Sequence, residues 1–207
     1  MTLQSAELLS RFTPDFLRSL PPPTQAEVAD LIEALDRERR ETVLYRLYPE
    51  TGPLRRELYP KHCAFFAAGV QHKERACVAA NRVGKTFGIG GYETTLHLTG
   101  LYPDWWPGRR FDHPIDAWAA GDTSETTRDI VQLALMGRPG EIGTGLIPGA
   151  NIIGNPTHRT GVPGAIGTAR VKHASGGVSF LGLKSYDQGR RTFQGTAKHV
   201  IWLDEEP

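Results

Sequence analysis

The stretch Ala79-Ala80-Asn81-Arg82-Val83-Gly84-Lys85-Thr86, "AANRVGKT", decides how this sequence is interpreted. It ends in the Gly-Lys-Thr of a phosphate-binding loop, in which the lysine reaches nucleotide phosphates and the hydroxyl binds magnesium. The position that normally carries the first glycine of such a loop holds Ala79, which is small enough to leave the turn possible. Because Gly-Lys-Thr alone is a weak signal, the assignment depends on the surrounding sequence.

The residues on either side of this loop predict a strand before it and a helix after it. "RACVAAN" at 75–81 is short and apolar, as a buried strand is, and "FGIGGYETTLHLTG" at 87–100 is typical of a helix that tolerates several glycines. A turn between a strand and a helix N-terminus points its backbone N–H groups at an anion. The sequence therefore predicts that residues 79–86 bind the phosphates of a nucleotide, with Lys85 on the phosphates and Thr86 on Mg²⁺.

A second stretch, Val200-Ile201-Trp202-Leu203-Asp204-Glu205-Glu206, supplies the acids that such a loop requires. Nucleotide hydrolases with a loop of this kind place an Asp at the end of an apolar strand, where it helps to hold magnesium. A Glu directly after it can orient and deprotonate the attacking water. Asp204 is therefore predicted as a metal ligand and Glu205 as the general base. A strand that ends in solvated acids is the alternative, but the two stretches together are much less common by chance.

The order of the predicted elements indicates the α/β class. Strands are expected at 115–121 and 199–205, a hairpin at 169–174 and 179–185, and helices at 62–69 and 122–137. Their alternation from Arg75 onward favours a mostly parallel sheet with helices on both faces. Residues 1–50 are expected to form a helical appendage, with one helix capped by Ser5 and an amphipathic second helix capped by Thr24, in which apolar residues recur at Val28, Leu31, Ile32 and Leu35.

Composition limits the setting of the protein more than its activity. The chain has 207 residues, 39% of them hydrophobic, and a net charge of +1, so the total charge predicts no partner. Cys63 and Cys77 make no disulfide framework, and no Cys or His spacing indicates zinc. Without a membrane-length apolar run or a secretory leader, a soluble, intracellular protein is expected.

The basic residues are unevenly distributed along the chain. Between Glu141 and Asp204 the only acid is Asp187, whereas seven cations lie there: Arg159, Arg170, Lys172, Lys184, Arg190, Arg191 and Lys198. Such a stretch suits a polyanion such as nucleic acid. A solvated basic face is an equally good explanation of the charge alone.

Three blocks together resemble the ATPase domain of the large terminase subunit of tailed bacteriophages. They are "YPKHCAFFAAGVQHKERACVAANRVGKT", "SYDQGRRTFQGT" and "VIWLDEEP", within residues 55–207, whereas residues 1–50 are less diagnostic. In that family the phosphate loop commonly lacks its first glycine, and here Ala79 stands at that position. The magnesium-binding strand of the family commonly ends in acids, as this one does with Asp204, Glu205 and Glu206.

The resemblance implies a DNA-packaging motor with a P-loop NTPase fold of the additional-strand, catalytic-glutamate type. The expected partners are double-stranded DNA, the small terminase subunit, the portal protein of the procapsid and further copies of the chain in a ring, in the cytoplasm of an infected bacterium. An ATPase domain is expected at 51–207, ending after the acidic strand. The remaining strands of its sheet and the nuclease domain of the family are then expected to be absent.

Several assignments stay open in the sequence. Arg128, Arg190 and Arg191 are candidates for an arginine that reaches a phosphate, and Arg82 and Asn81 could act within the loop. Tyr59, His62 and Phe66 could stack on the adenine base, although core packing is the more ordinary role. The alternatives to a packaging motor are another DNA-dependent ATPase, such as a helicase or recombinase core, and a nucleotide-binding module without catalysis.

Overall fold

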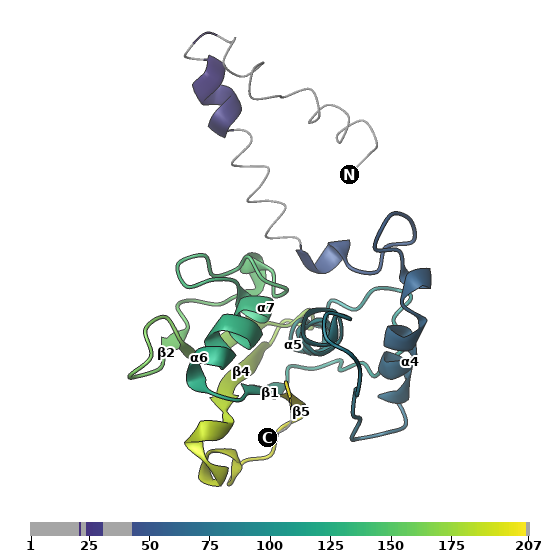
Figure 1. Cartoon of the computed structure of the whole chain (residues 1–207), viewed down its shortest axis with the longest axis vertical. Helices are drawn as coiled ribbons and strands as arrows, with labels where there is room; N and C mark the ends of the chain where they lie inside the picture. The colour runs from purple at the N-terminus through teal and green to yellow at the C-terminus, as the bar shows by residue number, and fades with distance from the viewer. Residues whose placement is uncertain (1–20, 22–23, 31–42, 206–207) are drawn as a thin grey trace. The chain divides into compact units, whose positions relative to one another are not determined.

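The computed structural model describes residues 21, 24–30 and 43–205. The chain divides into two units, residues 1–39 and 40–207, and Figure 1 labels helices and strands of the second. In the first unit, residues 24–30 are helical, which confirms the start of the helix predicted after the prolines. The helix predicted at Ser5 and the apolar positions Leu31, Ile32 and Leu35 lie outside the described residues.

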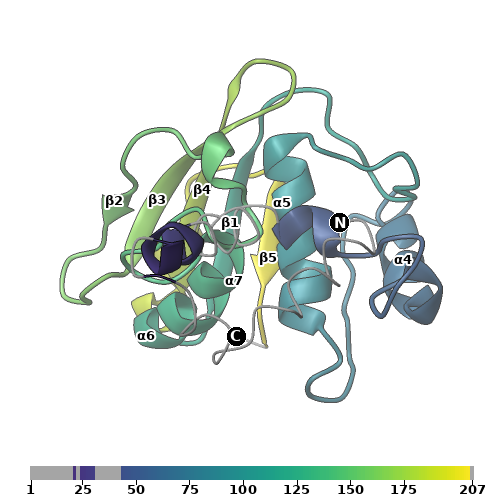
Figure 2. The ribbon, with the colours of Figure 1, turned by 90° about the horizontal axis from the view of Figure 1, so that it is seen from above.

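The second unit contains a five-stranded sheet in the order β2-β3-β4-β1-β5, which Figure 2 shows from β2 at the left to β5 beside helix α5. Three predicted strand regions are confirmed: the strand at 115–121, the hairpin at 169–185 and the apolar run before the acids. The strands are β1 (Asp116–Gly121), β2 (Thr157–His158), β3 (Ile166–Lys172), β4 (Val178–Ser185) and β5 (Val200–Leu203).

The sheet is mixed, so the prediction of a mostly parallel sheet is wrong although the α/β class is confirmed. Strand β1 runs parallel to both β4 and β5, with Ala119 opposite Leu183 and Trp202. Strands β3 and β4 pair antiparallel, as do β2 and β3. The reason is local: the turn at 175–177 joins β3 directly to β4, and a short connection of this kind permits only antiparallel pairing.

The main helices lie close to the ranges predicted from the sequence. Helix α4 spans Pro60–Ala68, and the helix after the loop begins as a π-helical segment, η3 (Lys85–Gly91), continues as α5 (Tyr92–Thr99) and ends at left-handed Gly100. The helix predicted at 122–137 is formed by α6 (Ser124–Thr126), the π-helical η4 (Thr127–Gln132) and α7 (Leu133–Met136). Short 3₁₀ turns lie at η1 (Val43–Arg46), η2 (Arg56–Leu58), η5 (Gly149–Asn151), η6 (Tyr186–Gln188) and η7 (Arg190–Phe193).

In the described part of the chain, α5 and the helix formed by α6, η4 and α7 cover the same face of the sheet, whereas the 3₁₀ turn η7 reaches Trp118 on the other face. The main core joins Ala117 and Ala119 of β1 and Leu181 and Leu183 of β4 to Leu98 of α5, with Val131 and Leu135 from the other helix. On the opposite face, Phe180, Ile201 and Leu203 remain about half exposed. The prediction of helices on both faces is therefore wrong for the residues described.

Helix α5 is the central helix of this unit, and every residue from Tyr92 to Thr99 is buried. One side of it meets the sheet, and the other meets a second core, formed with η1, α4 and the 101–106 loop. That second core is rich in aromatic residues: Tyr48, Phe66, Tyr92 and Trp106. The helix that follows the Gly-Lys-Thr loop is thus held from two sides.

Residues 75–81 form no strand, which corrects the prediction made for the segment before the loop. Residues 74–80 have no regular structure, and the Val78 side chain is 95% exposed. The other apolar side chains here, Ala76, Cys77, Ala79 and Ala80, are small. Burying them removes little apolar surface from water, so their apolar character alone does not place the segment in a sheet.

The glycines in the helix after the loop are explained by the strand behind it. A methyl group on Gly90 would overlap the indole of Trp202 on β5, and one on Gly91 would lie 2.8 Å from Leu146 Cδ1. The absence of side chains at these positions lets η3 lie directly against β5. The strand that precedes the acids and the helix that follows the loop are thereby in contact.

Gly90→Ala is expected to lower the free energy of unfolding by about 2 kcal/mol, because the overlap with a rigid ring outweighs the gain of about 1 kcal/mol in helix propensity. Denaturant unfolding followed by circular dichroism measures the change. Gly167→Ala is the matched control, because a methyl group there meets only ordinary contacts at 3.6 Å or more. A more stable Gly90→Ala variant would contradict the close packing of helix and strand.

Candidate functional site

The loop at 79–86 wraps around the start of the helix that follows it. Arg82 and Gly84 have positive φ angles of 62° and 86°, which turn the chain sharply on either side of Val83. Gly84 O accepts hydrogen bonds from the N–H groups of Gly88 and Ile89 at 2.8 and 3.0 Å, so the helix starts at the Gly-Lys pair. Residues 79–83 are exposed, and their backbone is open to a ligand.

The Lys85 side chain lies across the loop. Its Nζ donates a hydrogen bond of 2.6 Å to the carbonyl oxygen of Ala79, six residues earlier. The Lys85 amine thus contacts Ala79, the residue that stands in place of the usual first glycine. The amine is held at the mouth of the loop, where the sequence places the phosphates.

The structure brings together two predicted residues that are 118 positions apart in the sequence. The Thr86 hydroxyl donates a hydrogen bond of 2.9 Å to Asp204 Oδ1. Asp204 directly follows β5, and its N–H continues the parallel pairing by donating to Ala120 O at 2.8 Å. The two stretches singled out in the sequence therefore meet at the carboxyl end of β5.

The Asp204 carboxylate is buried, with 9% of the residue exposed. Burial raises its pKa, while the hydrogen bond from Thr86 and the charge of Lys85 favour the ionised form. The neighbouring Glu205 carboxylate raises the pKa further. A buried carboxylate in this situation is stabilised by an additional cation.

Glu205 is exposed and has a left-handed backbone, with φ of 73°. Its carbonyl oxygen accepts a hydrogen bond of 3.1 Å from the Tyr186 hydroxyl, so the turn after β5 is attached to the residue after β4. Burial raises the pKa of Tyr186 to about 12, which keeps this hydroxyl protonated as a donor. Tyr186 lies in one of the blocks that carried the resemblance, but its contact with Glu205 was not predicted.

Backbone strain is concentrated around these residues. Of the non-glycine residues described, those with positive φ are Tyr48, Arg82 and Glu205. Such conformations cost about 1–3 kcal/mol each and tend to cluster at functional sites. Arg82 lies in the loop and Glu205 follows the acidic strand, so two of the three belong to the predicted site.

The candidate arginines are in different environments. Arg128 forms an ion pair with Asp129, with Nε 2.7 Å from Oδ1, and donates to Pro163 O. Arg190 and Arg191 are exposed on η7, which is packed through Phe193 against Trp118 and Tyr186. Arg128 is thus held by its own chain, whereas Arg190 and Arg191 are accessible near Tyr186.

The basic stretch is divided between structural and exposed positions. Arg159 is half-buried and donates to Ser124 Oγ, Ser185 Oγ and Leu183 O, so it ties three segments together. Lys184 and Lys198 lie 5.4 and 5.3 Å from the centre of the Trp118 ring. Arg170 and Lys172 are exposed on β3, at positions that alternate with core residues. Several cations therefore share the sheet face that the helices leave open.

Two of the upstream aromatic residues are unavailable to a base. Phe66 is fully buried in the second core and His62 is 9% exposed, whereas Tyr59 is half-buried. Stacking of adenine on Phe66 or His62 is therefore not supported. These residues form contacts inside the protein, as their more ordinary interpretation predicted.

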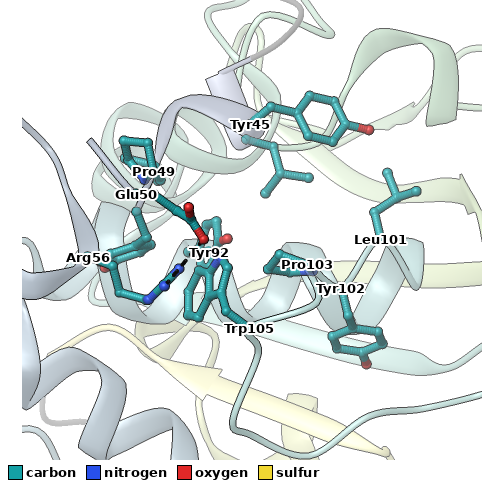
Figure 3. A pocket seen from close by; sticks show the side chains of 12 residues that line it. Tyr45, Pro49, Glu50, Arg56, Tyr92, Leu101, Tyr102, Pro103 and Trp105 are labelled. Atoms are coloured by element: carbon teal, nitrogen blue, oxygen red, sulfur yellow. Dashed lines mark ion pairs between the residues drawn. The ribbon is translucent and has the colours of Figure 1, made fainter. Parts of the chain in front are cut away.

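A separate pocket of about 320 Å³ lies between the 44–50 segment and the 101–105 loop (Figure 3). Within this pocket the Arg56 guanidinium lies over the Trp105 ring, and its Nη2 is 3.9 Å from Glu50 Oε1. None of the predicted loop or acidic residues lines this pocket. Among the residues that the structure describes, no helix has the length and apolar character that a membrane span requires.

The fold and site define a mixed α/β protein in which a Gly-Lys-Thr loop and an Asp-Glu strand end meet beside one sheet. The chain is 34% identical to the terminase large subunit of Salmonella phage P22 over 211 aligned positions, and it is a homologue of that protein. The match covers 92% of this chain, so it extends into residues 1–50, and the chain spans 40% of the length of the relative. No family model matches the chain, and no solved structure matches it.

Proposed function

We propose that this chain is the ATP-hydrolysing part of a phage DNA-packaging motor, with a P-loop NTPase fold. The observation that carries the proposal is the hydrogen bond between Thr86 and Asp204, because it joins the predicted phosphate loop to the predicted metal-binding acid. The similarity to a phage terminase large subunit favours DNA packaging over a helicase or recombinase core.

The residues present suit magnesium. Thr86 and Asp204 offer two hard oxygen donors that are already 2.9 Å apart, and Asp204 is a buried carboxylate next to Glu205. Magnesium is typically held by one or two protein oxygens, together with water and substrate phosphates. When bound, it would neutralise charge on the phosphates during transfer.

The proposed roles of the chain's own residues follow from their positions. Lys85 Nζ exchanges the Ala79 carbonyl for phosphate oxygens, while the N–H groups of the exposed residues 80–83 surround the same phosphates. The Glu205 carboxylate, exposed beside Asp204, accepts a proton from the attacking water. Arg190, Arg191 or Arg128 can supply a cation to the site of a neighbouring copy in a ring.

A calorimetric titration of MgATP into the protein tests the nucleotide site directly. We expect saturable binding with one nucleotide per chain, since one loop of this kind is present. Binding that needs no magnesium would count against the roles of Thr86 and Asp204. Binding without any turnover would support the alternative of a non-catalytic nucleotide-binding module.

Double-stranded DNA is expected to bind through the exposed cations, with an affinity that falls steeply with salt. Removing two cations that contact phosphates should reduce the magnitude of the slope of log K against log salt by about 1.8. Fluorescence anisotropy with labelled duplex DNA compares Arg190→Ala/Arg191→Ala with Arg170→Ala/Lys172→Ala, because both pairs are exposed. The pair that lowers the slope identifies the contacting surface, and a salt-independent affinity in the wild type would exclude both.

A further inference from the structure

Two buried side chains outside the predicted site contact the loop from behind. His62 of α4 has Nε2 3.0 Å from Val83 O and Nδ1 2.7 Å from the Tyr48 hydroxyl. The Tyr48 hydroxyl also donates to Gly88 O at 2.7 Å. Tyr48 and His62 are 3% and 9% exposed, and the two bonds of the Tyr48 hydroxyl are buried. Val83 and Gly88, which they hold, lie on either side of Lys85 and Thr86.

The hydrogen-bonding capacity of these groups defines the arrangement. Val83 O can only accept, so His62 Nε2 carries a hydrogen. Burial lowers the pKa of His62. The Tyr48 hydroxyl lies 2.7 Å from both His62 Nδ1 and Gly88 O, which links the three groups into one unit.

Both side chains also contact the loop sterically. A Cβ atom on Gly84 would lie 3.3 Å from His62 Cε1, and one on Gly88 would lie 2.9 Å from the Tyr48 oxygen. The glycines at these positions thus allow His62 and Tyr48 to approach the backbone closely. The contact is made from the side of α4 and η1, opposite to the one made by β5.

Tyr48 is itself held in an unusual conformation. Its φ of 57° is left-handed, which for a bulky residue persists only where the surroundings determine it. Its ring packs edge-on against four aromatic side chains, those of Tyr59, Phe66, Tyr92 and Trp105. The hydroxyl is therefore presented to Gly88 by a rigid aromatic cluster.

We infer that Tyr48 and His62 are positioning residues that hold the backbone from Val83 to Gly88 in the geometry in which Lys85 and Thr86 bind nucleotide. Neither side chain touches the phosphates; both act through backbone carbonyl groups. The inference rests on the proposed function, because it needs a nucleotide at the loop. It goes beyond that function by assigning a role to two residues outside the loop and the acidic strand.

The experiment compares MgATP affinity with thermal stability in four variants. Tyr48→Phe removes only the hydroxyl, and His62→Leu removes both ring nitrogens; each is expected to weaken MgATP binding about tenfold, the effect of one lost hydrogen bond at a buried site. His62→Gln, whose amide can still donate to Val83 O, should stay within about threefold of the wild type. His97→Gln is the control, since His97 is also buried but forms a hydrogen bond with Tyr102 and lies 3.5 Å from Glu93 Oε1 rather than contacting the loop.

Affinity is measured by calorimetry at a temperature at which every variant is folded. A loss of affinity in Tyr48→Phe and His62→Leu, with recovery in His62→Gln and none lost in His97→Gln, supports positioning. Lower melting temperatures with unchanged affinity would overturn it and leave the proposed function intact. If His62→Leu does not fold, Tyr48→Phe decides alone. Failure of the proposed function is distinct: the wild type then does not bind MgATP.

Discussion

Lys85→Ala is expected to weaken MgATP binding by at least about 100-fold, since charge-assisted hydrogen bonds to phosphate contribute about 1.5–3 kcal/mol each and the lysine makes more than one. Its free energy of unfolding should change little, because within the described part of the chain the hydrogen bond of the ammonium to Ala79 O is an exposed one. Calorimetric titration measures the affinity, and thermal melting checks the fold.

Lys61→Ala is the matched control for this substitution. Lys61 is exposed on α4, next to buried His62, so its removal takes away the same charge without opening the loop. We expect MgATP affinity within about twofold of the wild type, as for surface substitutions in general. Equal affinities for Lys85→Ala and Lys61→Ala would remove the basis for placing phosphates at this loop.

Glu205→Gln is expected to lower the rate of ATP turnover by about 10²–10⁴-fold while leaving MgATP affinity nearly unchanged. The amide keeps the size of the side chain but cannot accept a proton from water. Its effect on the fold should be small because Glu205 is exposed, and its backbone contact with Tyr186 is retained. Phosphate release under single-turnover conditions, with duplex DNA present, measures the rate.

Glu125→Gln provides the comparison, because Glu125 is an exposed glutamate at the start of α6, outside the loop and the acidic strand. Its turnover should match that of the wild type. If Glu205→Gln turns over ATP as fast as the wild type, hydrolysis does not use this carboxylate, and another residue would have to act as the base. No turnover in the wild type would instead favour the non-catalytic alternative.

Much of the fold could be predicted because it depends on local pattern. The apolar runs at β1 and β5, the hairpin of β3 and β4, and the helix that ends at Gly100 all carry their own periodicity or turn residues. The meeting of Thr86 and Asp204 was also anticipated, since a loop and an acidic strand of these compositions require each other.

The errors arose where the outcome depends on partners distant in the sequence. Whether 75–81 joins a sheet depends on a neighbouring strand, and the apolar character of Val78 carries no information about one. The mixed sheet follows from the hairpin of β3 and β4, whose strands pair antiparallel. The sequence predicts this hairpin, and a sheet that contains it has an antiparallel pair beside its parallel ones. Tyr48 and His62 were not assigned to the loop because no spacing in the sequence connects them to Val83 and Gly88.

The contact between Trp202 and the glycines of η3 has a mechanical consequence. An indole seated on Gly90 leaves no room for the helix to slide along the strand. Lys85, Asp204 and Glu205 are therefore expected to move as one rigid body, and in the proposed motor any rearrangement between steps would take place in neighbouring segments. The stretch at 76–80, which has no regular structure, is one such segment directly before the loop.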